Sequence, residues 1–252
     1  MRKFLLLAAL FTPLAQAEAI IVDSHSLLRL PGSNGQVRIE RLEVADYGTL
    51  LVPGGVTELR IGDLVLGHEA RIAIVPSAQP ISMSVEHGRF GAGSQITARG
   101  APGTFEREAM PGRNFTLRVQ SLDAERLSVD ARGGAGGPGY VGLDGGNGAA
   151  PGCTWGQAGR GHDGDNGGNG HDGAAGGQVR LELPQAFAAE RIQVNVDGGA
   201  PGPGGAGGQP GKGGASKGCL VYRADGGKAG RPGQAGQPGA AGPAGSVTVQ
   251  RF

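Results

Sequence analysis

The chain has 252 residues, a formal net charge of +1 and only 4% aromatic residues. This near-neutral charge gives no broad attraction to nucleic acid, which is therefore excluded as a partner. Glycine accounts for 52 residues, about three times its ordinary share. Much of the chain therefore has too few apolar side chains to fill a conventional core, and it is either disordered or ordered mainly by backbone hydrogen bonds.

An export signal is predicted at the N-terminus. A basic start is followed by an apolar stretch over residues 4–14 and by the small-x-small cleavage pattern Ala15-Gln16-Ala17. We expect a Sec-type signal peptide over residues 1–17. The apolar stretch is too short to span a bilayer and no later segment is apolar enough, so no membrane insertion is expected. The predicted location is secreted or cell-surface, with the periplasm as an alternative.

Residues 18–132 are predicted to form β-strands. Apolar and polar residues alternate in short runs, which places one face inward and the other outward. Turn signals such as Pro-Gly recur between the runs. Short strands at regular spacing are typical of a β-solenoid or a β-sandwich. The clearest runs are 37–44, 57–61, 70–75, 81–85 and 115–119.

Three stretches look like copies of one unit of about 20 residues. Each consists of a strand, a turn, a second strand and glycine, and they cover 81–100, 115–133 and 179–198. A last strand over 246–252 would begin a fourth copy. Stacked repeats let a solenoid bury its inner face. We therefore predict an all-β fold with a short parallel β-solenoid-like base, and a β-sandwich as the second choice.

Two long insertions separate the last copies, and each contains two runs with glycine at every third position. Period three matches the polyproline II helix, in which a bare glycine edge lets another backbone approach closely. We predict two inserted Gly-rich polyproline II hairpins, over 133–177 and 199–245, that form a bundle, with 178–198 as a β rung between them. A disordered tether and a collagen-like trimer are the alternatives. The four runs cover 133–148, 161–176, 199–214 and 227–245.

The two cysteines, Cys153 and Cys219, lie near the middle of the two insertions at matching positions. After export, an even number of cysteines favours a disulfide. Hairpins that start from adjacent rungs would bring these two residues together at the far end, so we predict a Cys153–Cys219 disulfide there.

The sequence around both cysteines holds the residue types that anchor binding surfaces. The candidate binding residues at this tip are Trp155, Leu220, Tyr222 and Arg223. The alternative interpretation is that Trp155, Leu220 and Tyr222 only pack over the disulfide and seal the end of the bundle.

No metal, cofactor or catalytic activity is expected. The chain has no nucleophile elbow, no His-Glu-x-x-His sequence and no phosphate loop. A set of acidic and amide residues recurs at every third position, but its members lie too far apart along such a helix for a compact calcium site. We interpret this set as a solvated polar face: Asp163, Asn166, Asn169 and Asp172.

The four glycine runs resemble those of polyglycine II or polyproline II bundle proteins. Two kinds are similar: the receptor-binding tips of certain phage tail-fibre adhesins, and the glycine-rich antifreeze proteins of arthropods. The resemblance rests on the repeat pattern alone, and it implies an architecture rather than a function. The export signal departs from the phage adhesins, and the β-strand base departs from the antifreeze proteins.

These observations favour an exported structural or adhesion protein whose tip binds a cell-surface or matrix glycan or protein. A self-associating matrix or filament subunit is the second hypothesis, because solenoid ends expose unpaired strands. A polysaccharide-active solenoid enzyme is the third, and it would need paired carboxylates on one face. Candidates for such carboxylates are Glu40, Glu43, Asp46 and Glu58.

Overall fold

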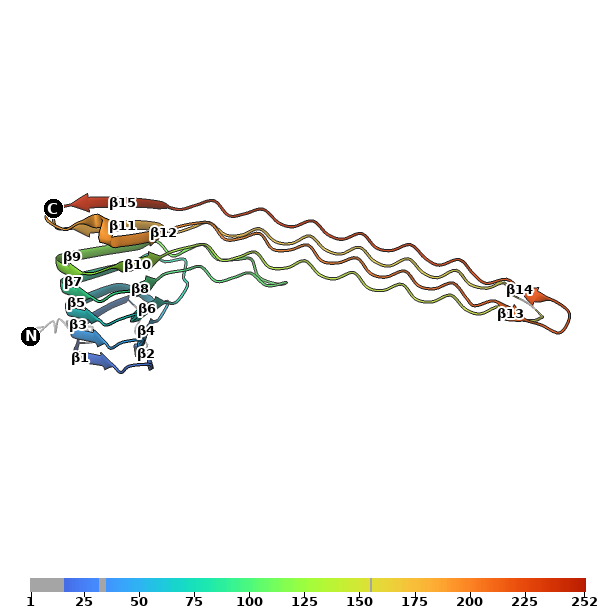
Figure 1. The fold of residues 1–252 in the computed structure, drawn as a ribbon, viewed down its shortest axis with the longest axis horizontal. Coiled ribbons are helices and arrows are strands. Elements are labelled where there is room, and N and C mark those ends of the chain that lie inside the picture. Colours follow the sequence, from blue (N-terminus) through green and yellow to red (C-terminus); the bar gives the residue numbers. More distant parts are fainter. Residues whose placement is uncertain (1–15, 32–34, 155) are drawn as a thin grey trace, which may run out of the picture.

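The computed structural model describes residues 16–31, 35–154 and 156–252. It consists of a β-strand base and a long, narrow arm that projects from one corner of the base (Figure 1). Residues 1–15 of the predicted signal peptide lie outside the described residues. In the described part of the chain, no helix is long and apolar enough to cross a membrane, and the one helical element is the 3₁₀ turn η1 (Ala189–Arg191).

Two parallel sheets form the base. The seven-stranded sheet contains, in spatial order, β1 (Gln16–Val22), β3 (Gly35–Val44), β5 (Val56–Leu66), β7 (Ile81–Phe90), β9 (Phe115–Ala124), β11 (Gln178–Leu183) and β15 (Ser246–Arg251). The six-stranded sheet contains β2 (Leu27–Arg29), β4 (Thr49–Val52), β6 (Arg71–Ile74), β8 (Ser94–Thr97), β10 (Leu127–Asp130) and β12 (Ile192–Asn195). The chain alternates between the sheets, so that one long strand and the next short strand make one rung.

The lower rungs repeat every 22 residues. Arg38 of β3 is the register partner of Arg60 of β5, and Thr49 of β4 is the partner of Arg71 of β6. Every strand pair in both sheets is parallel. Because a β-sandwich is built from antiparallel sheets, this pairing overturns the second-choice prediction of a sandwich.

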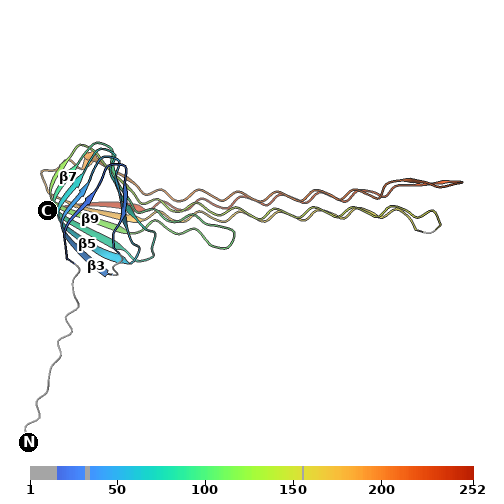
Figure 2. The same ribbon diagram turned by 90° about the horizontal axis from the view of Figure 1, so that it is seen from below.

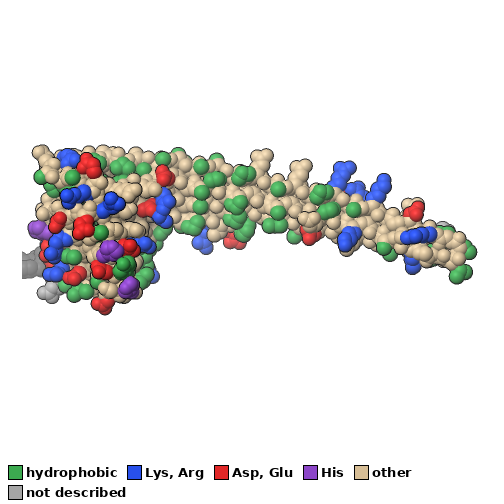
Figure 3. Space-filling model, in the orientation of Figure 1, with side chains coloured by type: hydrophobic (Ala, Val, Ile, Leu, Met, Phe, Trp, Pro, Cys, Tyr) green, Lys and Arg blue, Asp and Glu red, His purple; other side chains and the backbone are tan. Residues whose placement is uncertain are grey.

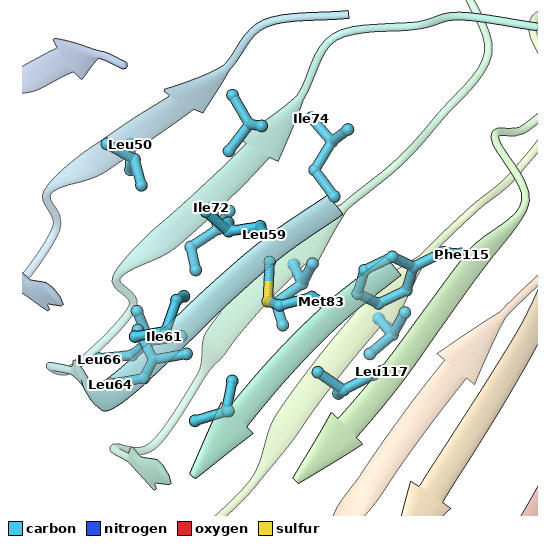
Figure 4. Close-up of a cluster of buried hydrophobic side chains, with 14 of the residues drawn as sticks. Leu50, Leu59, Ile61, Leu64, Leu66, Ile72, Ile74, Met83, Phe115 and Leu117 are labelled. Atoms are coloured by element: carbon cyan, nitrogen blue, oxygen red, sulfur yellow. The ribbon is translucent and has the colours of Figure 1, made fainter. Parts of the chain in front are cut away.

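The core lies between the two sheets and follows the alternation of the sequence. Figure 4 shows side chains from successive rungs meeting in one apolar cluster, with Met83 of β7 beside Leu117 of β9. Burying one aliphatic side chain of this size stabilises a fold by about 1.5–3 kcal/mol. The inward residues of β5 are at most 2% exposed: Leu59, Ile61, Leu64 and Leu66.

The arm consists of three insertions that leave the base at the same corner, each between a short strand and the next long strand. The first, residues 98–113, reaches only part of the way, whereas the second and third, residues 131–177 and 196–245, reach the tip (Figures 1 and 2). Each insertion runs out and returns. Antiparallel backbone bonds join its two halves, as from Asp165 N to Leu143 O at 2.9 Å and from Gly233 N to Gly208 O at 2.9 Å.

The arm also continues the register of the sheets. β10 pairs with β12 at a separation of 65 residues, and the outgoing segments keep this separation, as in the bond from Gln209 N to Asp144 Oδ1. β11 pairs with β15 at a separation of 68 residues, and the returning segments keep that one, as in the bond from Arg231 N to Asp163 Oδ1. Segments attached to neighbouring strands therefore stay parallel neighbours along the whole arm.

The predicted bundle of two polyproline II hairpins is wrong. In the described part of the arm, the glycine runs contain no helix, and the strands are limited to β13 (Lys217–Gly218) and β14 (Arg223–Ala224) at the tip. Three insertions take part instead of two. Residues 98–113 look like a plain loop in the sequence, yet Gly100 N donates to Arg132 O and Gly134 N donates to Met110 O, both at 2.9 Å. The arm is thus an extension of three rungs of the base.

Candidate binding tip

The tip consists of two loops that are joined covalently. Cys153 and Cys219 form a disulfide with a Cα–Cα distance of 5.6 Å, which is the pair expected from the sequence. The hydroxyl of Tyr222 donates a hydrogen bond to the carbonyl oxygen of Cys153 at 2.6 Å, and Cys219 N donates to Tyr222 O at 2.8 Å. The first loop is therefore held against the β13–β14 turn of the second.

The β13–β14 turn presents apolar side chains to solvent. Leu220 is 103% exposed and Val221 is 89% exposed, whereas Tyr222 is about half-exposed. Leu220 therefore does not pack over the disulfide, so the alternative interpretation of the tip does not hold for this residue. Arg223 donates from Nη2 to Ser216 Oγ at 2.9 Å. Trp155 lies outside the described residues.

Five exposed basic residues surround the turn and the arm behind it, and Figure 3 shows Lys and Arg gathered on this part of the arm. In this neighbourhood Arg160 pairs with Asp163 at 2.8 Å. The five form no ion pair within the described parts of the chain. We call this group the basic collar: Lys212, Lys217, Arg223, Lys228 and Arg231.

The polar set on the second glycine run has a structural role that the sequence analysis missed. Each Oδ1 atom accepts a hydrogen bond from a backbone N–H of the fourth run, at 2.7–2.9 Å. All four residues are exposed, as expected of a solvated face, and the bonds give that face a structural role as well. The four pairs are Asp163 with Arg231, Asn166 with Gln234, Asn169 with Gln237, and Asp172 with Ala240.

These four side-chain to backbone hydrogen bonds form a ladder along the arm, and the sequence carries a partial signal for it once the register is known. At a separation of 68, Pro243 stands opposite Ala175, and proline has no N–H that would need an acceptor. At a separation of 65, Pro203 likewise stands opposite Pro138, whereas Asp144 and Asn147 accept from Gln209 N and Lys212 N. Six acceptor side chains thus stand opposite N–H groups and two residues without an acceptor stand opposite prolines, although Val141 stands opposite Ala206, which has an N–H.

Removing two steps of the ladder should loosen the fourth run. We expect the double variant Asn166→Leu and Asn169→Leu to lose about 1 kcal/mol per lost hydrogen bond. Amide exchange at Gln234 and Gln237 should become faster, which hydrogen-exchange mass spectrometry measures. The variant Asn166→Asp with Asn169→Asp keeps both acceptors and should keep the protection. Equal exchange in the two variants would show that the side-chain bonds do not hold the segment.

An ion cluster fixes the arm to the base. Asp130, at the end of β10, is 8% exposed and accepts hydrogen bonds from Arg99 and from Arg132, whose Nη2 lies 3.0 Å from Oδ2. Burial by itself would raise the pKa of Asp130, but the hydrogen bonds from both arginines outweigh it and lower the pKa below the ordinary 3.8. Because Arg99 belongs to the first insertion and Arg132 to the second, the carboxylate joins the two at their root.

Three of the four carboxylates considered for an enzyme lie in local ion pairs on the base. Glu40 lies 3.0 Å from Arg38, Glu43 lies 3.1 Å from Arg41, and Glu58 lies 2.6 Å from Arg60. Asp46 accepts a hydrogen bond from the backbone N–H of His68 at 2.8 Å. Among the described residues, no group of His, Cys, Asp and Glu is arranged to hold a metal ion.

Comparisons with known proteins identify no relative of this chain. No protein-family model, no curated protein and no solved structure matches this chain. The function proposed below is therefore inferred from the geometry of the arm and its tip.

Proposed function

We propose that this chain is an exported adhesion protein whose arm carries a contact site, the tip, away from the β-strand base. The observation that carries the proposal is the exposure of Leu220 and Val221 at the extreme end of the arm. Apolar side chains exposed together commonly mark interaction sites. The disulfide and the bond between Tyr222 and Cys153 hold this turn in place, which reduces the entropy lost on binding.

The disulfide also supports export. Disulfides form and persist in oxidising compartments, which fits an extracellular or periplasmic protein. We propose that the predicted signal peptide directs the chain there and that the protein acts by binding rather than by catalysis. The ion-paired carboxylates on the base support this preference, because their charges are engaged locally.

Attachment of the purified mature protein to cells of the producing organism tests the proposal. Leu220→Ser combined with Val221→Ser should weaken attachment at least about tenfold, because two apolar contacts are lost. The matched control is Val141→Ser with Leu143→Ser, which changes two aliphatic residues on the side of the arm that are 65% and 73% exposed. Equal attachment by the tip variant and the wild-type protein would reject the tip as the contact site.

Self-assembly is the second candidate function. Strand β15 forms the end of the seven-stranded sheet in the described chain, and its outer edge carries unpaired backbone groups. Val247, Val249 and Phe252 are each 43–46% exposed there. Light scattering that rises with protein concentration, and that persists in the tip variant, would favour assembly through this edge over attachment through the tip.

A further inference from the structure

We propose that the partner of the tip is the surface of a bilayer that contains anionic phospholipids. Leu220 and Val221 would enter the headgroup region while the basic collar lies against the lipid phosphates. This inference rests on the proposed function, since it names the chemistry that the same tip would recognise. Three features of the tip support it.

The first feature is the kind of apolar surface. Leu220 and Val221 are adjacent aliphatic side chains at the outermost turn, and their exposures of 103% and 89% show that no part of the described chain covers them. The ring of the half-exposed Tyr222 follows directly. Aliphatic residues backed by an amphipathic aromatic ring are typical of segments that lie in a membrane interface.

The second feature is the position of charge. Lys217 and Arg223 belong to β13 and β14, whose paired residues close the apolar turn from both sides. Lys212, Lys228 and Arg231 lie behind them along the arm. Over residues 212–231 the sequence has five basic residues and a single acidic residue, Asp225, and the Asp163 carboxylate that accepts from Arg231 N is paired with Arg160. A few basic residues next to an apolar segment supply the second of the two signals that stable membrane attachment needs.

The third feature separates a lipid surface from a glycan or a protein. Specific recognition of those partners uses polar groups that pair across the interface. At this tip the Tyr222 hydroxyl is already bonded to Cys153 O, and Arg223 is bonded to Ser216 Oγ. The side chains that the outermost turn presents to solvent are therefore mainly the aliphatic Leu220 and Val221, with the lysine ammonium groups of the basic collar behind them, and this pairing suits acyl chains and headgroups.

Co-sedimentation of the full mature protein with vesicles tests the inference. We expect binding to vesicles of phosphatidylcholine with phosphatidylglycerol, and binding at least about tenfold weaker to phosphatidylcholine alone. Leu220→Ser with Val221→Ser should lower binding to the anionic vesicles at least about tenfold. Lys228→Gln with Arg231→Gln should lower it and reduce its sensitivity to salt, because two screened charge contacts are lost. The matched control on the side of the arm, Val141→Ser with Leu143→Ser, should bind as the wild type does.

The outcomes distinguish the inference from the function on which it rests. If the wild-type protein attaches to cells through the tip but does not sediment with anionic vesicles, the inference that the partner is a lipid surface is overturned. The proposed adhesion function is then retained. Tip binding to isolated cell-surface glycan or protein would then identify the partner. Vesicle binding that is equal in the wild type and the tip variant would also overturn the inference, because another part of the chain would be responsible.

Discussion

Replacing Gly145 with alanine should open the outer part of the arm, whereas the same change at the next residue, Gly146, should leave it closed. A Cβ atom at position 145 would lie 2.1 Å from His162 O and 2.8 Å from Asp163 O. A Cβ at position 146 would meet only the His162 ring, at 3.5 Å, which is an ordinary contact. The backbone can relieve the first clash only by separating the segments.

This separation would break the bond from Gly145 N to Gln209 O and misalign its neighbours. We expect Gly145→Ala to cost about 3 kcal/mol, at the upper end for overpacking, because both sides of the clash are backbone. Gly146→Ala should be neutral or stabilise by up to about 1 kcal/mol, since it reduces the entropy of the unfolded chain.

Hydrogen exchange read along the arm measures the difference. In Gly145→Ala, fast exchange should spread from residue 145 toward the tip while the strands of the base keep their protection, because the apolar core formed by the described residues lies in the base. If both variants keep the protection of the wild type, close backbone packing is not what requires glycine at every third position.

The sequence predicted the parts of this structure that depend on local periodicity. Alternation placed strands at 37–44 and 57–61, and the structure has β3 and β5 there. The matching positions of Cys153 and Cys219 indicated the disulfide, because both insertions start from neighbouring rungs and have nearly the same length. These inferences needed only the period of the apolar alternation or the number of residues between two positions.

The parts that were missed depend on the register between distant segments. Asn166 is an acceptor for Gln234 because the two lie 68 residues apart in register, and no local pattern gives that number. Residues 98–113 contain only a few glycines, so their place in the arm depends on their bonds to Arg132 O and from Gly134 N. Without these bonds the segment is indistinguishable from a surface loop.

Arg113 illustrates the same limit for burial. In the sequence it follows Pro111-Gly112 and looks like an exposed turn residue. In the structure it is 1% exposed, and its guanidinium donates to the carbonyl oxygens of Gln79, Val75 and Val56 at 2.7, 3.3 and 2.5 Å. Desolvation lowers the pKa of Arg113, yet a guanidinium stays protonated in proteins.

Replacing Arg113 should therefore destabilise the base. Arg113→Met keeps the apolar stem but leaves three carbonyl oxygens without their donor, two in the connection between β6 and β7 and one at the first residue of β5. An unsatisfied buried acceptor costs about 1–3 kcal/mol, and only Val56 O is deeply buried here, so we expect a loss of about 2–4 kcal/mol in the free energy of unfolding. Denaturant unfolding followed by far-ultraviolet circular dichroism measures this loss.

Two further variants show whether the hydrogen bonds are the cause. Arg113→Lys keeps a cation with fewer and differently directed donors, so its stability should lie between those of the wild type and Arg113→Met. Arg107→Met changes an exposed arginine of the same insertion and should alter stability by no more than about 0.5 kcal/mol. Arg113→Met as stable as the wild type would mean that the desolvation cost of the guanidinium cancels what its three bonds contribute. The apolar contacts of the rungs would then stabilise this corner of the base. The arm would be attached to the base through the hydrogen bonds among the insertions and through the ion cluster at Asp130.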